Sequence, residues 1–212
     1  YNGALVVSGM ALGIDGQAQR GAMSIDKPTV AVLGSGIDVI QPKKNKKIYE
    51  YMLSSGAVYS EYPPGTPRLP GHFPARNRLI SGLSVGVVVV EAEKSSGSLH
   101  TADFALEQGK DLFAVPNSIK NPKGEGTNKL IKENAYIVTS VNDILDEYKG
   151  MFIEEKNIKS FDEKEYNREF MADYFIDGLE NITPLEKEIL NAIKKEALTT
   201  DSISEITSLP VE

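Results

Sequence analysis

Short apolar runs alternate with helix-like stretches through the first 148 residues, and this alternation limits the possible folds more than any other feature. The apolar runs lie at 4–8, 29–33, 57–60, 85–90, 111–115 and 135–139. The helix-like stretches lie near 14–24, 45–55, 77–84, 98–108, 127–134 and 141–148. Continuously apolar runs are typical of strands covered on both faces. The sequence therefore predicts an α/β fold with a doubly wound, mainly parallel sheet over residues 1–148.

Residues 149–182 have a different character, because they are charged, acidic and poor in glycine. Tyr166, Phe170 and Tyr174 follow one another at four-residue spacing, which places them on one face of a helix. The segment is predicted to be an acidic linker with a short amphipathic helix. The aromatic stripe is better explained by packing than by function.

A further unit is predicted from Thr183 onward. Thr183 can cap a helix, Pro184 suits the first helical position, and Glu186 completes a capping box. A second short helix and the start of a third follow before residue 212. Residues 183–212 are therefore interpreted as the first part of a helix-turn-helix or winged-helix domain.

Composition narrows the class of protein. A hydrophobic content of 41% and a charged content of 25% are ordinary for a soluble globular protein. There is no cysteine, which excludes disulfides and thiolate metal sites. No apolar run approaches the roughly 18 residues of a membrane span, and residues 1–30 lack the pattern of a signal peptide. We expect a cytoplasmic protein without a membrane partner.

Charge is distributed unevenly along the chain. The net charge of −7 argues against a general nucleic-acid binder. Residues 1–150, however, hold 16 lysines and arginines against 15 acidic residues, whereas residues 151–212 hold 7 against 15. Because local charge decides whether a polyanion binds, the first part of the chain remains a candidate binding region.

Five predicted strands are followed by segments rich in Gly, Ser, Pro, Asn or charge. In an open α/β sheet, ligands bind at the carboxyl ends of the strands. Gly34 and Gly36 do not form a dinucleotide fingerprint, because Val39 occupies the third glycine position. Together with Gly9 they can still bring backbone N–H groups close to a phosphate, although they can equally serve tight turns.

A basic cluster surrounds Asn45 where a helix is predicted to begin. It consists of Lys43, Lys44, Lys46 and Lys47. Lysines in the first turn oppose the helix dipole, which favours an anionic ligand as compensation. A solvated helix face is the simpler explanation.

Arg76 and Arg78 follow a segment stiffened by five prolines between residues 63 and 74. On a helix, side chains two residues apart point about 200° apart, so both arginines could share only an extended ligand. Single-stranded nucleic acid would be such a ligand. The alternative is a pair of structural ion pairs, for example with Glu61 and Glu91.

Enzymatic interpretations have little support in the sequence. His72 lies in a Pro/Gly-rich loop and His100 in a predicted helix, and neither has a partner at catalytic or metal-ligand spacing. Acidic residues near strand ends could bind magnesium or transfer protons, but no two have diagnostic spacing. These residues are Asp15, Asp38, Glu61 and Glu91.

Five stretches together resemble the DprA/Smf family (DNA-processing protein A). They are SGMALGIDGQAQRGAM, TVAVLGSGIDVIQPKKN, SEYPPGTPRLPGHFPARNRLISGLS, VVVEAEKSSGSLHTADFALEQGKDLFAVP and GTNKLIKENA. They occur in the order of the family and cover about residues 5–140. The resemblance implies a fragment that lacks the N-terminal part and most of the C-terminal winged-helix domain.

The resemblance also implies a function. It implies a Rossmann-like domain that dimerises, binds single-stranded DNA without sequence specificity, and helps to load the RecA recombinase during natural transformation. It implies no enzymatic activity, no cofactor and no metal. By motif, the implied DNA-binding residues are Ser8, Gly9, Gly34, Gly36, Lys43, Lys44, Asn45, Arg76, Asn77 and Arg78. Lys27, just outside a motif, is a weaker candidate.

Two departures from the family pattern are visible. The Gly-Ser-Arg motif of the family would lie before Tyr1, and Gln41 stands where the family usually has tyrosine. Two other classes of protein remain open. A phosphoribohydrolase-like enzyme would use a related fold, but SSGSLHTADF lacks the double glycine and the glutamate of that signature. An adaptor would bind protein partners through its acidic tail.

Overall fold

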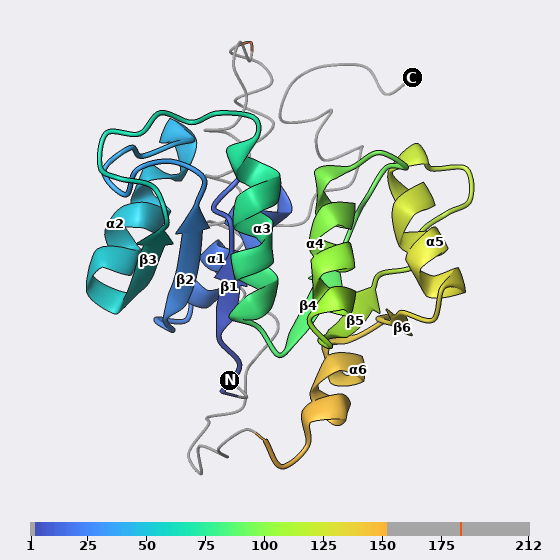
Figure 1. The fold of residues 1–212 in the computed structure, drawn as a ribbon. Coiled ribbons are helices and arrows are strands. Elements are labelled where there is room, and N and C mark those ends of the chain that lie inside the picture. The colour runs from blue at the N-terminus through green and yellow to red at the C-terminus, as the bar shows by residue number, and fades with distance from the viewer. Residues whose placement is uncertain (1–2, 152–182, 184–212) are drawn as a thin grey trace. The chain divides into compact units, whose positions relative to one another are not determined.

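The computed structural model describes residues 3–151 and Thr183. The chain divides near residue 156 into two units, and every described helix and strand belongs to the first. The first half of that unit contains β1 (Val6–Ser8), α1 (Ile14–Met23), β2 (Thr29–Leu33), α2 (Lys46–Ser55) and β3 (Gly56–Ser60). Its strands pair in parallel in the order β1-β2-β3 (Figure 1).

The second half repeats this alternation. It contains α3 (His72–Gly82), β4 (Gly86–Val89), α4 (Gly97–Glu107), β5 (Asp111–Ala114), α5 (Glu125–Lys132), β6 (Tyr136–Ile137) and α6 (Val141–Leu145). Its strands pair in parallel in the order β4-β5-β6. Short 3-10 turns lie at Lys43–Asn45, Pro122–Gly124 and Asp146–Tyr148. No described helix has the length and apolarity that crossing a membrane requires.

The parallel α/β prediction is confirmed, with one difference in the sheet. The described strands form two sheets of three rather than one continuous sheet, because β1 and β4 do not pair with each other. The chain passes from one sheet to the other through α3. This helix packs against β2 and also against α4, and Figure 1 shows the two helices side by side.

Each sheet has an apolar core of its own. The core of the first half consists of Met10, Ala31, Leu33, Ile48, Tyr49 and Met52. The main core of the second half consists of Val89, Ala92, Ala102, Leu112, Ala114, Leu130 and Ala135. All five residues of β2 are buried, which explains its continuously apolar sequence TVAVL.

The largest error in the predicted elements concerns α3, which begins at His72 and not near residue 77. The cluster of prolines and glycines around residue 72 indicated a loop. Pro74, however, is the third residue of the helix, where no intrahelical N–H bond is needed. The earlier start places Arg76 inside the helix instead of at its entrance.

The predicted acidic linker and winged-helix start lie outside the described residues, apart from Thr183. The domain boundaries at 148 and 182 therefore remain predictions.

Candidate anion-binding site at the strand ends

A narrow hollow of about 20 Å³ lies where β1 and β2 end. The loops that follow these strands lie at the top of Figure 1, next to the start of α3. The hollow is lined by Gly9, Ala11, Leu33, Gly34, Ser35, Gln41, Pro42, Arg68, Phe73 and Arg76. No carboxylate is among these described residues, so two arginines supply the only formal charge of the lining.

Arg76 lines the hollow, although its side chain is only 5% exposed. Its Nη1 donates to the carbonyl oxygen of Gly9, at 2.9 Å, and to that of Val32. Its Nε donates to Oδ1 of Asn77 at 3.2 Å. The guanidinium is thus held by neutral acceptors at the ends of β1 and β2.

Burial lowers the pKa of the Arg76 guanidinium from its ordinary value. Asp15 acts in the opposite direction, and the nearby Arg68 lowers the pKa further. The carboxylate of Asp15 accepts hydrogen bonds from the backbone N–H groups of Gly9 and Ala11, at 3.0 and 3.2 Å. Because an arginine in a protein remains charged, Arg76 is a buried cation without a directly bonded counter-ion among the described residues.

Gly9 is required for this arrangement by its size. A Cβ atom at Gly9 would lie 2.5 Å from Cζ and Nη2 of Arg76. Carbon atoms in contact are normally 3.5–4.0 Å apart, so any larger residue would overlap the guanidinium. The predicted importance of Gly9 therefore has a steric basis in the structure.

Gly34 and Gly36 also lie at points of close approach. A Cβ at Gly34 would be 3.3 Å from Cδ1 of Phe73, and one at Gly36 would be 2.7 Å from the carbonyl oxygen of Pro63. Neither glycine has the positive φ angle of a left-handed turn. Their small size lets α3 and the loop after β3 pack onto the end of β2, and Ser8 ends β1 at the same edge.

Arg68 is a member of the site that sequence reasoning missed. Its guanidinium carbon lies 4.5 Å from the centre of the Phe73 ring, a cation–π geometry. The residue is exposed and belongs to the proline-rich segment before α3. Its position among prolines was a usable signal, because a stiff segment presents a side chain at low entropic cost.

Arg78 lies on a different side of α3 from Arg76, as the helical geometry predicted. Its Nη2 forms an ion pair with Glu61 at 2.5 Å, and both side chains are about half exposed. The ion-pair alternative is therefore correct for Arg78. It is wrong for Arg76, which bonds to carbonyl oxygens, and Glu91 lies elsewhere.

Asn45 is fully buried, and both polar atoms of its side-chain amide form hydrogen bonds within the fold. Its Nδ2 donates to the carbonyl oxygens of Met10 and Ala11, both at 3.0 Å. Its Oδ1 accepts from Nη2 of Arg20 at 2.7 Å. Asn45 thus ties the start of α2 to the loop after β1, and Asn77 likewise bonds within the fold, to Arg76.

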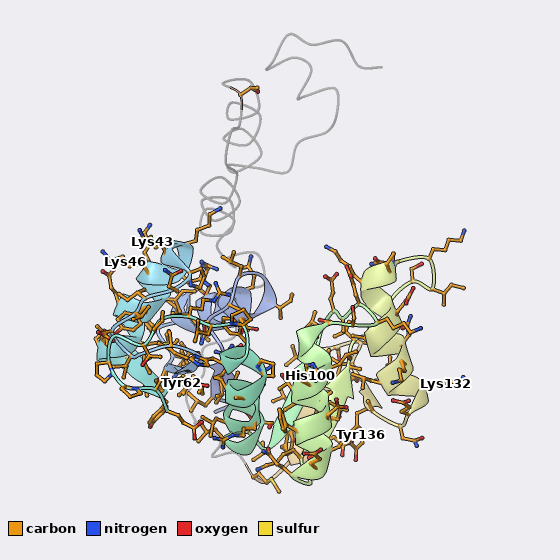
Figure 2. All side chains as sticks on the ribbon, turned by 45° about the horizontal axis from the view of Figure 1, so that its top comes forward. Lys43, Lys46, Tyr62, His100, Lys132 and Tyr136 are labelled. Atoms are coloured by element: carbon orange, nitrogen blue, oxygen red, sulfur yellow. The ribbon has the colours of Figure 1, made fainter. Side chains whose placement is uncertain are left out.

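The lysines around Asn45 are exposed. Figure 2 shows the side chains of Lys43 and Lys46 extending away from the surface at the start of α2. Lys46 pairs with Glu50 on the same helix at 3.4 Å. Lys43 and Lys44 precede α2 at the edge that carries the hollow, whereas Lys27 precedes β2 and so lies at the amino ends of the strands.

Two other candidates for catalysis or metal binding, His72 and Asp38, make contacts within the fold. His72 stacks on Tyr62 with ring centres 3.9 Å apart, and its Nδ1 lies 3.0 Å from the carbonyl oxygen of Gly34. Asp38 accepts a hydrogen bond from the N–H of Gly65 at 2.7 Å. Across the described part of the chain, no group of three or more metal-ligating side chains comes together.

A second, wider hollow of about 260 Å³ lies beyond the end of β4. It is lined by Glu91, Ala92, Glu93, Ser95, Ser96 and Lys123. Two carboxylates face one ammonium group there, so its charge is opposite to that of the first hollow.

The fold and the first hollow together define a parallel α/β protein with a cationic site at the carboxyl ends of its strands. The model of the family described as DNA recombination-mediator protein A matches residues 1–149. The chain belongs to this family, so the resemblance to DprA/Smf proteins is confirmed.

Two relatives illustrate the extent of the match. The chain is 47% identical over 147 residues to DNA processing protein DprA of Streptococcus pneumoniae, covering 69% of this chain and 52% of that protein. It is 47% identical over 145 residues to protein Smf of Escherichia coli, covering 68% and 39%. The chain thus spans about half the length, or less, of these relatives.

Solved structures agree with the fold. The structure of DprA from S. pneumoniae matches with a TM-score of 0.67 and 47% identity, over 69% of this chain and 52% of that one. DNA processing protein A from Helicobacter pylori matches with a TM-score of 0.65 and 31% identity, over 72% and 69%. That structure is described as showing a single-stranded DNA binding mode.

Proposed function

We propose that this chain binds single-stranded DNA without sequence specificity, through the cationic edge at the ends of β1 and β2. The observation that carries the proposal is the buried guanidinium of Arg76, which faces a hollow whose described lining holds no carboxylate. A buried cation without a bonded counter-ion is costly unless an anion completes its coordination. A phosphate group is such an anion, and phosphate contacts give affinity without reading sequence.

The surroundings of Arg76 favour a polyanion over a small anion. Lys43 and Lys44 are exposed at the same edge, and residues 20–78 hold 9 basic residues against 4 acidic ones. Such a distribution attracts a chain of phosphates despite the net charge of −7. The H. pylori relative, described by its single-stranded DNA binding mode, supports the choice of ligand.

The wider role follows from the family and goes beyond binding. We infer that the protein acts as a recombination mediator that helps to load RecA onto single-stranded DNA during natural transformation. This role needs no catalytic residue, no cofactor and no metal, and it places the protein in the cytoplasm. A homodimer fits the role, because two copies would present two cationic edges to one strand.

The proposal is tested by fluorescence anisotropy of labelled oligo-dT in a salt series, with duplex DNA as competitor. For Arg76→Ala we expect a loss of about tenfold to hundredfold in affinity, the range of one charged hydrogen bond. The slope of log affinity against log salt should fall by about 0.7 per phosphate contact removed. Arg76→Ala combined with Arg78→Ala should lose little more, because Arg78 is paired with Glu61.

Two controls keep the result interpretable. Lys132→Ala removes the same charge from α5, away from Lys43 and Lys46 in Figure 2, and should leave binding unchanged. Arg76→Lys retains the charge if Arg76→Ala does not fold, as judged by urea unfolding. An unchanged affinity and salt slope in folded Arg76→Ala would overturn the proposal.

The rival classes make different predictions. A phosphoribohydrolase would release free base from a nucleoside monophosphate, and this release should depend on the hollow beyond β4 instead of Arg76. An adaptor would retain its protein partners in a pull-down after Arg76→Ala has abolished DNA binding.

A further inference from the structure

We propose that the hollow binds a single phosphate group. The buried Arg76 and the exposed Arg68 of the proline-rich loop would both donate hydrogen bonds to it. The inference rests on the proposed function and makes it more specific. It assigns a role to Arg68 and Phe73, and it limits this site to one phosphate of the ligand.

The size of the hollow sets the limit. A volume of about 20 Å³ exceeds only slightly the 10–15 Å³ that one water molecule needs. An oxygen atom of a phosphate is about the size of a water molecule, so one phosphate oxygen can enter the hollow, whereas a base or a sugar cannot. The rest of a nucleotide must therefore remain outside, over the surface formed by the loops.

Two arginines converge on this small volume. Arg76 and Arg68 both line the hollow, and the charge of Arg68 is close enough to lower the pKa of Arg76. Like charges held together without a carboxylate between them are stabilised when an anion binds. The tetrahedral phosphate suits this pair, because each guanidinium offers a planar fork of N–H donors.

Phe73 determines where Arg68 lies. The ring holds the Arg68 guanidinium at 4.5 Å and lies 6.0 Å from the guanidinium carbon of Arg76. Phe73 is the second residue of α3, so its ring is fixed by the same helix that positions Arg76. Arg68 is exposed where Arg76 is buried. From this position it would contact a bound phosphate from the solvent side.

The phosphate bound in the hollow could be an internal diester of a DNA strand or the monoester at its end. The first experiment therefore compares three oligo-dT ligands by anisotropy competition: circular, linear with a 5′-hydroxyl, and linear with a 5′-phosphate. The variants are Arg68→Ala, Arg68→Lys and Phe73→Leu, with Lys132→Ala as the matched control for loss of charge.

We expect Arg68→Ala to weaken binding about tenfold, within the range for a charged hydrogen bond, and to lower the salt slope by about 0.7. Arg68→Lys should recover part of the loss, and Phe73→Leu should produce a smaller loss without a change in charge. If the effect is equal for circular and linear ligands, the site holds an internal diester. If it is confined to the 5′-phosphorylated ligand, the site holds a terminal monoester.

Two outcomes would overturn the inference, and they are distinguishable from failure of the proposed function. If wild-type protein binds oligo-dT and Arg68→Ala binds equally well with an unchanged slope, Arg68 does not contact phosphate. If Arg68→Ala lowers the salt slope by about 1.4 or more, which corresponds to two or more phosphate contacts, the site is not limited to one phosphate. If wild-type protein binds none of the ligands, the proposed function itself fails.

Discussion

Replacement of Gly9 by alanine tests the position of Arg76 without touching its charge. The added methyl carbon would lie 2.5 Å from Cζ and Nη2 of Arg76 and 2.6 Å from Nη1. These distances are about 1 Å shorter than a normal contact. Because the three atoms nearest to this methyl carbon all belong to the end of the Arg76 side chain, the guanidinium is the group that must move. It would leave the carbonyl oxygens of Gly9 and Val32.

The expected cost follows from those two hydrogen bonds. A hydrogen bond from a charged donor contributes about 1.5–3 kcal/mol, so losing both destabilises the fold by roughly 3 kcal/mol or more. The displaced guanidinium no longer faces the hollow. Affinity for single-stranded DNA should therefore fall to nearly the level of Arg76→Ala, about tenfold to hundredfold below wild type.

Urea unfolding and anisotropy with oligo-dT measure the two effects. Gly97→Ala is the matched control, because a Cβ there meets nothing within 4 Å. It should change stability by no more than about 1 kcal/mol and leave binding unchanged. Both measurements are then repeated with Gly9→Ala in an Arg76→Ala background.

The double mutant decides whether the reasoning is correct. If Gly9→Ala acts through Arg76, it should cost much less in protein that already lacks the guanidinium, and the two changes will be strongly non-additive. Strictly additive losses of stability and affinity would refute the steric argument. So would a Gly9→Ala protein that binds DNA with the wild-type salt slope.

Three further predictions concern the fold. Gly86→Ala places a Cβ against Tyr148 Oη and 2.9 Å from Phe113 Cε2, so it should lower the free energy of unfolding by about 1–3 kcal/mol in urea and leave DNA binding intact. Asn45→Ala should cost about 2–4 kcal/mol in the same assay, because it removes three hydrogen bonds, to the carbonyl oxygens of Met10 and Ala11 and from Nη2 of Arg20. Hydrogen bonds lower the pKa of Asp143 below its ordinary value of 3.8, and the largest effect comes from the backbone N–H of Thr139. The ionised carboxylate therefore contributes fully to the free energy of unfolding above pH 3.8, and this contribution is lost as the pH falls further. In Asp143→Asn, the urea midpoint should depend less on pH in that acidic range.

The fold was largely predictable because the middle strand of each sheet, β2 or β5, is almost entirely buried. Five buried residues in β2 leave an unmistakable apolar run. β6 is only two residues long and exposed, and its expected span of 135–139 was accordingly too long. The start of α3 was misplaced because the amino-terminal turn of a helix tolerates proline, so Pro74 gave no reliable boundary.

The site was predictable in its location but not in the roles of its residues. The strand ends identified Gly9, Arg76 and Asn45 as special. Only the fold shows that the Asn45 amide donates hydrogen bonds to the carbonyl oxygens of Met10 and Ala11, which lie 35 and 34 residues away in the sequence. The partners of Arg76, Gly9 and Val32, lie 67 and 44 residues away, so no local pattern could indicate them.

The division of the strands into two sheets, each with its own core, has a consequence for how the domain opens. Residues that share a core lose their protection together, whereas residues in separate cores need not. Native-state amide hydrogen exchange should therefore resolve two cooperative units, one around β2 and one around β5, coupled through the contact of α3 with α4. Because Arg76 lies on α3 and bonds to the ends of β1 and β2, a ligand bound there would slow exchange first in the unit around β2.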